Sequence, residues 1–148
     1  MILLDANVLL YAYNASFTQH GRIRAWLEPL LAGGGPVALA WQSIMAFLRI
    51  GTNPRAFPEP LMVEEALTIM QEWLGHPNVV VLQPTERHWG IFTRLVHAGR
   101  LRAGRMMDAH LAALAVEHGA VLGTTDTGFR VFADLRLVNP LDEPSFPA

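Results

Sequence analysis

Cysteine and lysine are both absent from this chain of 148 residues. Without cysteine, the protein has no disulfide bond, no thiolate metal ligand and no thiol nucleophile. Without lysine, it has no side chain for a Schiff base or a lysine phosphate clamp, and all eleven basic residues are arginine. The sequence therefore excludes thiol and Schiff-base chemistry and leaves oxygen and imidazole groups as the candidate reactive side chains.

Charged residues and long apolar runs are also scarce. Charged residues make up 16% of the chain and the formal net charge is −2, so no basic excess indicates a nucleic-acid or membrane-surface binder. No apolar run reaches the roughly 18 residues of a membrane span, and the first residues carry no basic leader. With 51% hydrophobic residues, we expect one domain, residues 1–148, in a soluble cytoplasmic protein without membrane association.

Short apolar runs alternate with helical patterns along the chain. The runs have the length of buried parallel strands and begin at Ile2, Val37, Val79, Val121 and Leu137. Between them, apolar residues recur at helical spacing, which predicts helices over 5–12, 20–31, 41–50, 63–74, 84–99 and 107–118. This alternation predicts parallel βαβ units and an α/β sandwich with a central parallel sheet.

Three aspartates stand where a predicted strand ends or a helix begins. Asp5 directly follows the first apolar run, and Asp126 follows the fourth. Asp108 opens the helix before the fourth run and shares a stripe with Leu111 and Ala115, so we expect its carboxylate to point toward the core. Taken alone, each aspartate also fits a helix cap or a turn.

Taken together, the three aspartates predict a metal site. Because the carboxyl ends of parallel strands meet at one edge of a sheet, we expect Asp5, Asp108 and Asp126 to converge there. Converging carboxylates repel one another unless a cation lies among them, and such oxygen ligands suit Mg²⁺ or Mn²⁺. A site of this kind supports phosphoryl transfer, in which the metal activates water and neutralises charge on the scissile phosphate.

The same segments resemble a known family. Ile-Leu-Leu-Asp5-Ala-Asn-Val-Leu, Met-Met-Asp108-Ala-His-Leu-Ala-Ala-Leu-Ala and Leu-Gly-Thr-Thr-Asp126-Thr-Gly-Phe look like the motifs of the PIN domain, specifically of VapC-type toxins from bacterial toxin–antitoxin pairs. Phe-Leu-Arg-Ile-Gly-Thr-Asn-Pro-Arg55 and the closing Asn139-Pro-Leu segment resemble one bacterial branch of these toxins. The resemblance covers the whole chain.

This resemblance implies a fold, an activity and partners. The fold is a PIN-like three-layer α/β/α sandwich with a central parallel sheet. The activity is that of a Mg²⁺-dependent endoribonuclease, with Asp5, Asp108 and Asp126 as catalytic and metal-binding residues. The implied partners are an RNA substrate and a cognate antitoxin protein, and the resemblance leaves open whether the chain forms a homodimer.

One part of the family pattern is missing. PIN nucleases usually carry a glutamate in the helix after the second strand, and no acidic residue occurs in 29–58. Ala46 takes the expected position. Either the metal site has fewer charged ligands, with Gln42 and Ser43 as the polar side chains nearby, or Glu86 supplies the missing carboxylate from a neighbouring helix start.

A basic loop precedes Asp108 and contains Arg100, Arg102 and Arg105. Such a cluster is commonly a solvated turn. Beside an acidic metal site, however, an RNA substrate needs cations to offset its phosphates, and arginine binds phosphate with two donors. Both interpretations stay open, and the second assigns all three arginines to RNA binding.

We expect His110 and the four tryptophans to have structural rather than functional roles. His110 is two residues from Asp108 and therefore on a different helix face, which predicts a structural or surface role rather than a metal ligand. The tryptophans fall within helical patterns, which predicts core positions rather than base-stacking platforms; they are Trp26, Trp41, Trp73 and Trp89. Of these, Trp41 lies nearest the predicted sheet edge.

Other classes of protein compete with this interpretation, namely proteins with an aspartate that carries a phosphoryl group and binding modules. An aspartate after the first strand also occurs in haloacid-dehalogenase-type phosphatases and in receiver domains, but both normally need a lysine that this chain lacks. The alternative that stays open is a PIN-like binding module whose metal site has weakened with the missing glutamate and which acts through a protein partner.

Overall fold

The computed structural model describes residues 1–142, and a five-stranded parallel sheet lies at its centre. Every pair of neighbouring strands is parallel. The strands are β1 (Ile2–Leu4), β2 (Val37–Leu39), β3 (Val79–Val81), β4 (Val121–Gly123) and β5 (Leu137–Val138), and their order across the sheet is β3-β2-β1-β4-β5. Each predicted apolar run is thus a strand, and the parallel sheet is confirmed.

The order of the strands places a switch point between β1 and β4. From β1 the chain adds β2 and β3 on one side and later adds β4 and β5 on the other. Leu4 and Gly123 are paired at the carboxyl ends of the two central strands. Ligands of open α/β sheets bind outside the carboxyl ends of the strands at such a switch point. The segments that follow β1 and β4 are therefore the first place to look for a site.

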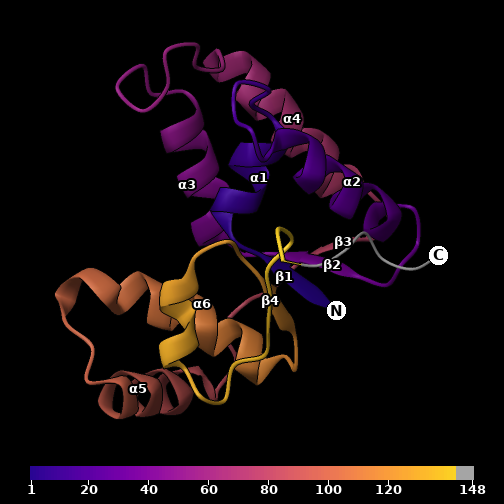
Figure 1. Ribbon diagram of the computed structural model, residues 1–148. Coiled ribbons are helices and arrows are strands. Elements are labelled where there is room, and N and C mark those ends of the chain that lie inside the picture. The colour runs from indigo at the N-terminus through magenta and orange to yellow at the C-terminus, as the bar shows by residue number, and fades with distance from the viewer. Residues whose placement is uncertain (143–148) are drawn as a thin grey trace.

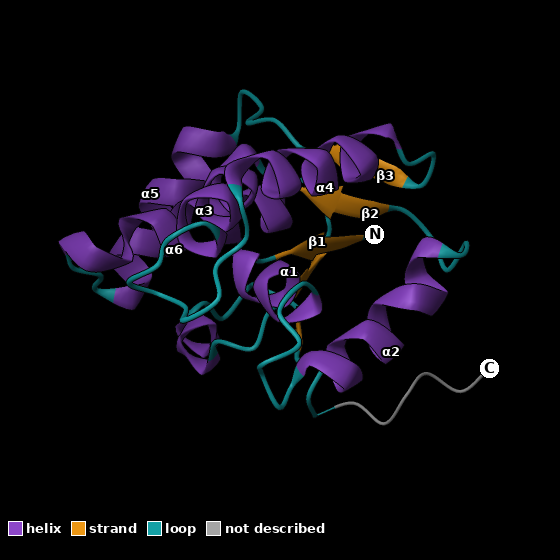
Figure 2. Ribbon diagram, turned by 90° about the horizontal axis from the view of Figure 1, so that it is seen from above, coloured by secondary structure: helices purple, strands orange, loops and turns teal. Residues whose placement is uncertain are grey.

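Helices cover both faces of the sheet. Figure 1 shows α1 to α4 on one side and α5 and α6 on the other, and Figure 2 looks down on the first of these layers. The helices are α1 (Ala6–Ala12), α2 (His20–Leu31), α3 (Trp41–Gly51), α4 (Val63–Gly75), α5 (His88–Gly99) and α6 (Met106–Glu117), with short 3₁₀ helices η1 (Ala103–Arg105) and η2 (Thr127–Val131). This arrangement confirms the three-layer α/β/α sandwich.

Alternate residues of the central strands pack into two separate cores. Leu3 and Leu122 pack on the side of α5 and α6, whereas Leu4 and Leu39 pack on the side of α1 to α4. Successive side chains of a strand point to opposite faces, so a strand covered on both faces is apolar at every position. This explains why β2 contains only buried apolar residues.

Helix α6 is buried on all sides over its middle section. Every residue from Leu111 to Ala115 is buried, because α6 lies between the sheet and α5. The single apolar stripe that spacing predicted for this helix is therefore wrong, since a helix buried all round has no polar face. None of the helices in residues 1–142 has the length and apolar character that crossing a membrane requires.

Helix α5 begins later than the sequence pattern predicted. The helix starts at His88, and the residues from Pro84 to Arg87 are not helical, with a turn at Glu86 and Arg87. Thr85 donates its backbone N–H and its hydroxyl to the carboxylate of Glu117, and Arg87 donates to the Glu117 carbonyl. These contacts bind the turn to the end of α6, which explains why it does not continue the helix.

Two of the four tryptophans lie in the core and two do not. Trp26 and Trp73 are buried, as predicted. Trp89 is 72% exposed and stacks on Phe92 along the outer face of α5, and Trp41, the first residue of α3, is 47% exposed. Helical periodicity places a residue on a face, but only the packing of neighbouring helices decides whether that face is covered.

Candidate functional site

Asp5 occupies the switch point between β1 and β4. It is the N-cap of α1, and its Oδ1 accepts a hydrogen bond from the Ala6 backbone N–H at 2.7 Å. Its Oδ2 accepts from the Thr124 hydroxyl at 2.7 Å and from the Asn7 side-chain amide at 3.1 Å. The carboxylate is therefore held in one orientation by groups from both central strand ends.

The pKa of the Asp5 carboxyl depends on its burial, its hydrogen bonds and the other two predicted aspartates. Burial raises the pKa of the Asp5 carboxyl above its usual value, the negative charges of Asp108 and Asp126 raise it further, and hydrogen bonds from Thr124 and Ala6 act in the opposite direction. The charges of Asp108 and Asp126 therefore act on Asp5 in the same direction as its burial.

Asp126 and Asp108 are each held by a partner of their own. Oδ1 of Asp126 accepts from the Gly128 backbone N–H at 2.8 Å and caps η2, and the Asp126 N–H donates to Oγ1 of Thr124 at 3.1 Å. Oδ2 of Asp108 accepts from Nε of Arg105 at 2.7 Å, and the Asp108 side chain is 29% exposed. Asp108 thus faces a partly solvated site rather than the core that its stripe predicted.

The carboxylate oxygens of the three aspartates suit a hard divalent cation. However, the three side chains do not form a cluster around one point. Carboxylate oxygens are the ligands that Mg²⁺ and Mn²⁺ prefer. Among residues 1–142, no three His, Asp or Glu side chains are grouped as a metal-binding cluster. Asp108 is turned toward Arg105 instead. Binding of an ion by all three aspartates would therefore require this ion pair to open or to lengthen.

The residues near the missing glutamate leave two polar atoms without partners. Gln42 donates from Nε2 to the Met107 carbonyl at 2.9 Å, next to Asp108. Its Oε1 and the Ser43 hydroxyl are buried and have no hydrogen-bond partner in the part of the chain that the structure describes. Gln42 therefore brings an oxygen without a partner in residues 1–142 to the first turn of α6, beside the residue that precedes Asp108.

Glu86 does not take the place of that glutamate. It is exposed and neighbours Thr85, which contacts Glu117 at the C-terminal end of α6. Asp108 lies nine residues earlier in the same helix, about 14 Å away at 1.5 Å per residue. The suggestion that Glu86 completes the site is wrong, because the turn before α5 is bound to the far end of α6.

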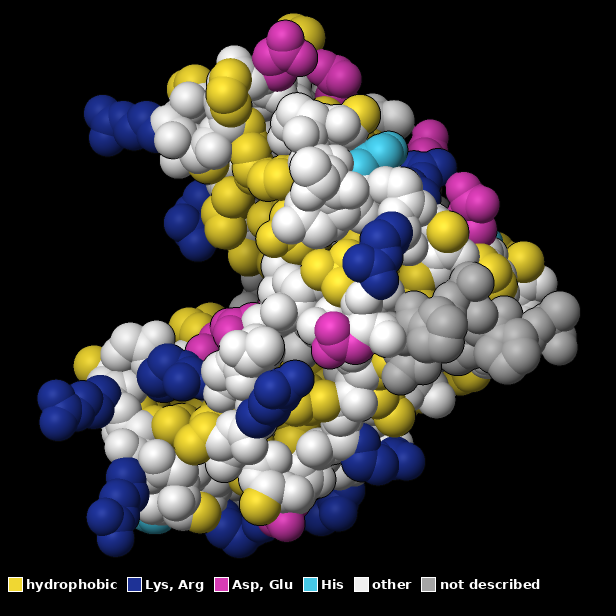
Figure 3. All heavy atoms as spheres, viewed as in Figure 1, with side chains coloured by type: hydrophobic (Ala, Val, Ile, Leu, Met, Phe, Trp, Pro, Cys, Tyr) yellow, Lys and Arg dark blue, Asp and Glu magenta, His cyan; other side chains and the backbone are white. Residues whose placement is uncertain are grey.

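A groove of about 900 Å³ runs between α3 and α6 beside the aspartates. Figure 3 shows it as a deep notch with acidic side chains at its inner end. Ala46, where the resemblance led us to expect a glutamate, lines this groove. The lining residues are Trp41, Gln42, Met45, Ala46, Leu48, Arg49, Met107 and His110. On the α6 side the groove is lined by Met107, the residue before Asp108.

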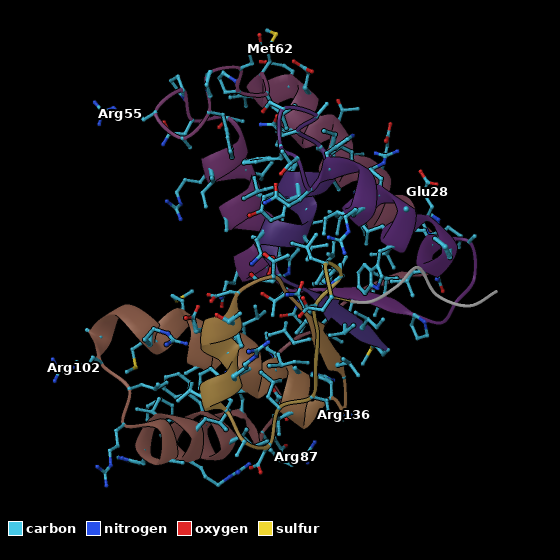
Figure 4. The ribbon with its side chains drawn as sticks, viewed as in Figure 1. Glu28, Arg55, Met62, Arg87, Arg102 and Arg136 are labelled. Carbon is cyan, nitrogen blue, oxygen red and sulfur yellow. The ribbon has the colours of Figure 1, made fainter. Side chains whose placement is uncertain are left out.

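The predicted basic loop divides into one bound arginine and two free ones. Arg105 is held by Asp108 and also donates from a terminal nitrogen to the Gly128 carbonyl at 2.9 Å. Arg100 and Arg102 are exposed and form no ion pair within residues 1–142. Figure 4 shows Arg102 and Arg55 extending outward on opposite sides of the notch. Arg105 is thus part of the acidic site, whereas Arg100 and Arg102 are available to a ligand.

Sequence reasoning missed a buried chain formed by Glu117, His88 and His110. The Glu117 side chain is fully buried, and its Oε1 lies 2.5 Å from Nδ1 of His88. Nε2 of His88 lies 2.9 Å from Nδ1 of His110, which lines the groove. One signal was present: an acidic residue at the C-terminal end of an apolar helix is unfavourable for the helix dipole and needs a specific partner.

The pKa values within this chain reflect its burial and its hydrogen bonds. Burial alone would raise the pKa of Glu117, but hydrogen bonds from Thr85 and His88 outweigh it and lower the pKa. Burial, together with the neighbouring His88, lowers the pKa of His110. At neutral pH the chain therefore contains a carboxylate at its buried end and a neutral imidazole at its groove end.

Fold and site together define a class of protein, the α/β/α nucleases that carry aspartates at the switch point of a parallel sheet. The PIN domain family matches residues 2–135. Ribonuclease VapC37 of Mycobacterium tuberculosis is 41% identical over 140 residues, which cover 95% of this chain and 97% of that protein. Ribonuclease VapC33 of the same species is 36% identical over 97% of this chain and 100% of its own. The chain belongs to the PIN-domain family and, within it, to the group of VapC ribonucleases.

Solved structures of lower identity share the fold. FitAcB from Neisseria gonorrhoeae has a TM-score of 0.67 at 24% identity, over 97% of this chain and 100% of its own. VapBC2 from Rickettsia felis, bound to a promoter DNA fragment, has a TM-score of 0.68 at 18% identity, over 94% and 98%. VapC20 of Mycobacterium tuberculosis, a sarcin–ricin loop cleaving toxin, has a TM-score of 0.59 at 17% identity, over 92% and 99%.

Proposed function

We propose that this protein is a Mg²⁺-dependent endoribonuclease that acts as the toxin of a type II toxin–antitoxin pair, with Mn²⁺ as an alternative ion. The observation that carries the proposal is Asp5, a partly buried carboxyl held at the switch point by Thr124 and Asn7, whose pKa is raised by burial and by Asp108 and Asp126. A bound cation would offset the cost of keeping these groups ionised. Relatives that are 36% and 41% identical are named ribonucleases, which supports RNA as the substrate.

The three aspartates share one role in this proposal, and neighbouring side chains position them. Asp5, Asp108 and Asp126 would hold the metal, which when bound supplies an activated water and neutralises charge on the scissile phosphate. Thr124 and Asn7 orient Asp5 by donating to its Oδ2. Arg105 holds Asp108 in the ion-free protein, which prevents unopposed repulsion among the carboxylates.

We assign both the RNA substrate and the protein partner to the groove between α3 and α6. Arg100 and Arg102 are free to bind RNA phosphates, and Met107, which lines the groove, lies between this basic loop and Asp108 in the sequence. The groove also exposes apolar side chains, with Met45 51% and Met107 59% exposed. Such a surface fits a protein partner, and structural neighbours include the VapBC complex of Salmonella typhimurium and a toxin–antitoxin complex of Klebsiella pneumoniae. We propose a cognate antitoxin as that partner; homodimer formation stays a prediction.

RNA cleavage by tag-free protein tests the activity. Labelled single-stranded RNA is incubated with wild type in Mg²⁺, in Mn²⁺ and in EDTA, and with the variants Asp5→Asn, Asp126→Asn and Asp134→Asn. Asp134 is the matched control, because it is an exposed aspartate paired with Arg94 outside the site. We expect cleavage only with a divalent ion, loss in the first two variants and retention in the control. Cleavage in EDTA, or full cleavage by Asp5→Asn, would contradict the proposal.

A binding module is the second candidate, and two observations favour it. Ala46 replaces the family glutamate, and the described residues contain no preformed metal cluster. Under this alternative the wild type cleaves no RNA in any divalent ion but still binds a protein partner in the groove. The cleavage assay with Mg²⁺ and Mn²⁺ separates the two functions.

A further inference from the structure

We propose that the outer face of α5 is a second contact surface for the RNA substrate, on which the indole ring of Trp89 stacks with an unpaired base and Arg100 binds a phosphate. The inference rests on the proposed ribonuclease function and extends its binding surface beyond the groove and the acidic site. It is carried by an exposed aromatic ring in a segment that contains arginines and no acidic residue.

Trp89 presents one face of its indole ring to solvent. The residue is 72% exposed near the start of α5. Its ring stacks on that of Phe92, with the centroids 5.7 Å apart and the planes inclined by 28°. Phe92 is partly buried and stacks in turn on His88, at 6.4 Å and 17°. The indole is therefore supported from below by two other rings, and its outer face is open to a further flat ring such as a base.

The segment that contains Trp89 is basic. Residues 87–107 include five arginines and neither aspartate nor glutamate. Figure 3 shows arginine side chains gathered over the layer that Figure 1 identifies as α5 and α6. Three of the five arginines contact other residues of the protein, whereas Arg100 and Arg102 are exposed and form no ion pair within residues 1–142. This segment is therefore suited to an anionic strand.

Trp89 and Arg100 stand near opposite ends of the exposed side of α5. They are eleven residues apart, which is about 16 Å along the helix axis. Thr93 and His97, four and eight residues after Trp89, lie between them and are partly and fully exposed, so no element of residues 1–142 covers this side. Beyond Arg100 the chain continues through the basic loop to Asp108. A strand that follows this loop away from the acidic site thus reaches the outer face of α5.

The chemistry of this surface favours RNA over a protein partner. From Pro84 to Met106, Trp89 is the only large hydrophobic residue that is exposed, whereas the core of a protein interface is a continuous apolar patch. Helix α4 provides the contrast, because it exposes three aliphatic side chains, and residues 59–75 contain four glutamates and no basic residue. One stacking ring beside unpaired arginines matches single-stranded RNA, whose splayed bases stack on aromatic side chains.

Two RNA probes separate stacking from charge. They are a 12-nucleotide single strand without self-complementary sequence and the same strand annealed to its complement. Fluorescence anisotropy in EDTA, which prevents metal-dependent cleavage, gives the affinity of each probe over a range of salt concentrations. The variants are Trp89→Leu, Trp89→Phe and the control Leu67→Ala, a change at an exposed residue of the acidic helix α4.

Trp89→Leu should bind the single strand at least about fivefold more weakly at every salt concentration, which corresponds to the loss of one stacked base. The slope of log affinity against log salt should not change, because no phosphate contact is removed. Duplex binding should match that of the wild type, since the bases of a duplex are already stacked on one another. Trp89→Phe should retain most of the affinity for the single strand, and Leu67→Ala all of it.

The outcomes separate this inference from the proposed function. If the wild type cleaves RNA in Mg²⁺ and Trp89→Leu binds the single strand with full affinity, the inference alone is overturned. An equal loss of affinity for both probes would also overturn it, because stacking requires an unpaired base. A wild type that sediments as a dimer, together with a monomeric Trp89→Leu, would assign this face to a second copy of the chain and overturn it. A wild type that neither binds nor cleaves RNA would overturn both proposals.

Discussion

Nε of Arg105 lies 2.7 Å from Oδ2 of Asp108, so a candidate metal ligand is already paired with a cation. The same guanidinium donates to the carbonyl of Gly128, two residues beyond Asp126. Arg105 therefore joins the start of α6 to the segment after β4. The two side chains are 36% and 29% exposed, so solvent screens the pair and limits its contribution to stability. A divalent ion at Asp108 has to compete with this arginine.

Replacing Arg105 with glutamine should tighten the binding of a divalent ion. The change releases Asp108 from its competing cation, and a screened pair of this kind is worth about 0.2–1 kcal/mol, up to about fivefold in affinity. Calorimetric titration with Mn²⁺ measures the effect. Arg102→Gln is the control, because Arg102 forms no ion pair within the described residues. Weaker Mn²⁺ binding by Arg105→Gln would show that Arg105 supports the site rather than competing for it.

The ionisation of Asp5 should destabilise the metal-free protein as pH rises. Its folded pKa lies above the unfolded value of 3.8, so the folded state binds the proton more tightly. The stabilisation is complete below the unfolded pKa and is lost as pH rises through the folded pKa. In EDTA, the free energy of unfolding of wild type relative to Asp5→Asn should therefore fall as pH increases above 4. Urea denaturation of both proteins across pH 4–8 measures this difference. A constant difference would mean that Asp5 has an ordinary pKa.

Removing the two free arginines should weaken RNA binding through its salt dependence. If Arg100 and Arg102 each contact one phosphate of single-stranded RNA, their double replacement with alanine should flatten the slope of log affinity against log salt by about 1.4 units. Fluorescence anisotropy with a 2′-fluoro RNA pool, which avoids cleavage at the 2′-position, gives the slope in EDTA. Arg136→Ala serves as a control, because Figure 4 shows Arg136 away from the notch. Equal slopes in variant and wild type would assign the loop to a solvated turn.

The exposed and buried tryptophans should differ sharply in their contribution to stability. Trp26→Ala removes a side chain that is 2% exposed in the core between the sheet and α2, and should cost about 3–5 kcal/mol. Trp89→Ala removes one that is 72% exposed, and should change stability by less than about 1 kcal/mol. Thermal or urea unfolding of the two variants provides the comparison. A large loss in Trp89→Ala would indicate that this surface is covered by another copy of the chain.

Residues at strand ends were the most predictable part of the site. Asp5 and Asp126 come after apolar runs with the length of buried strands, and parallel strands bring their carboxyl ends to one edge. The partners of these aspartates were not predictable. Thr124 donates to Asp5 across 119 positions of sequence, and no local pattern marks such a contact. The same holds for Gln42, whose amide reaches the Met107 carbonyl of another helix.

The sequence by itself determined the class of fold, because hydrophobic periodicity and chain connectivity are local properties that specify strands, helices and their alternation. It also determined which aspartates precede helices or follow strands. Only the tertiary structure decided which helix faces are covered, that Arg105 pairs with Asp108, and that Glu117 reaches the groove through His88 and His110. These features depend on contacts between side chains that packing brings together. Such contacts form only after the helices and strands have taken their positions, so local sequence patterns do not reveal them.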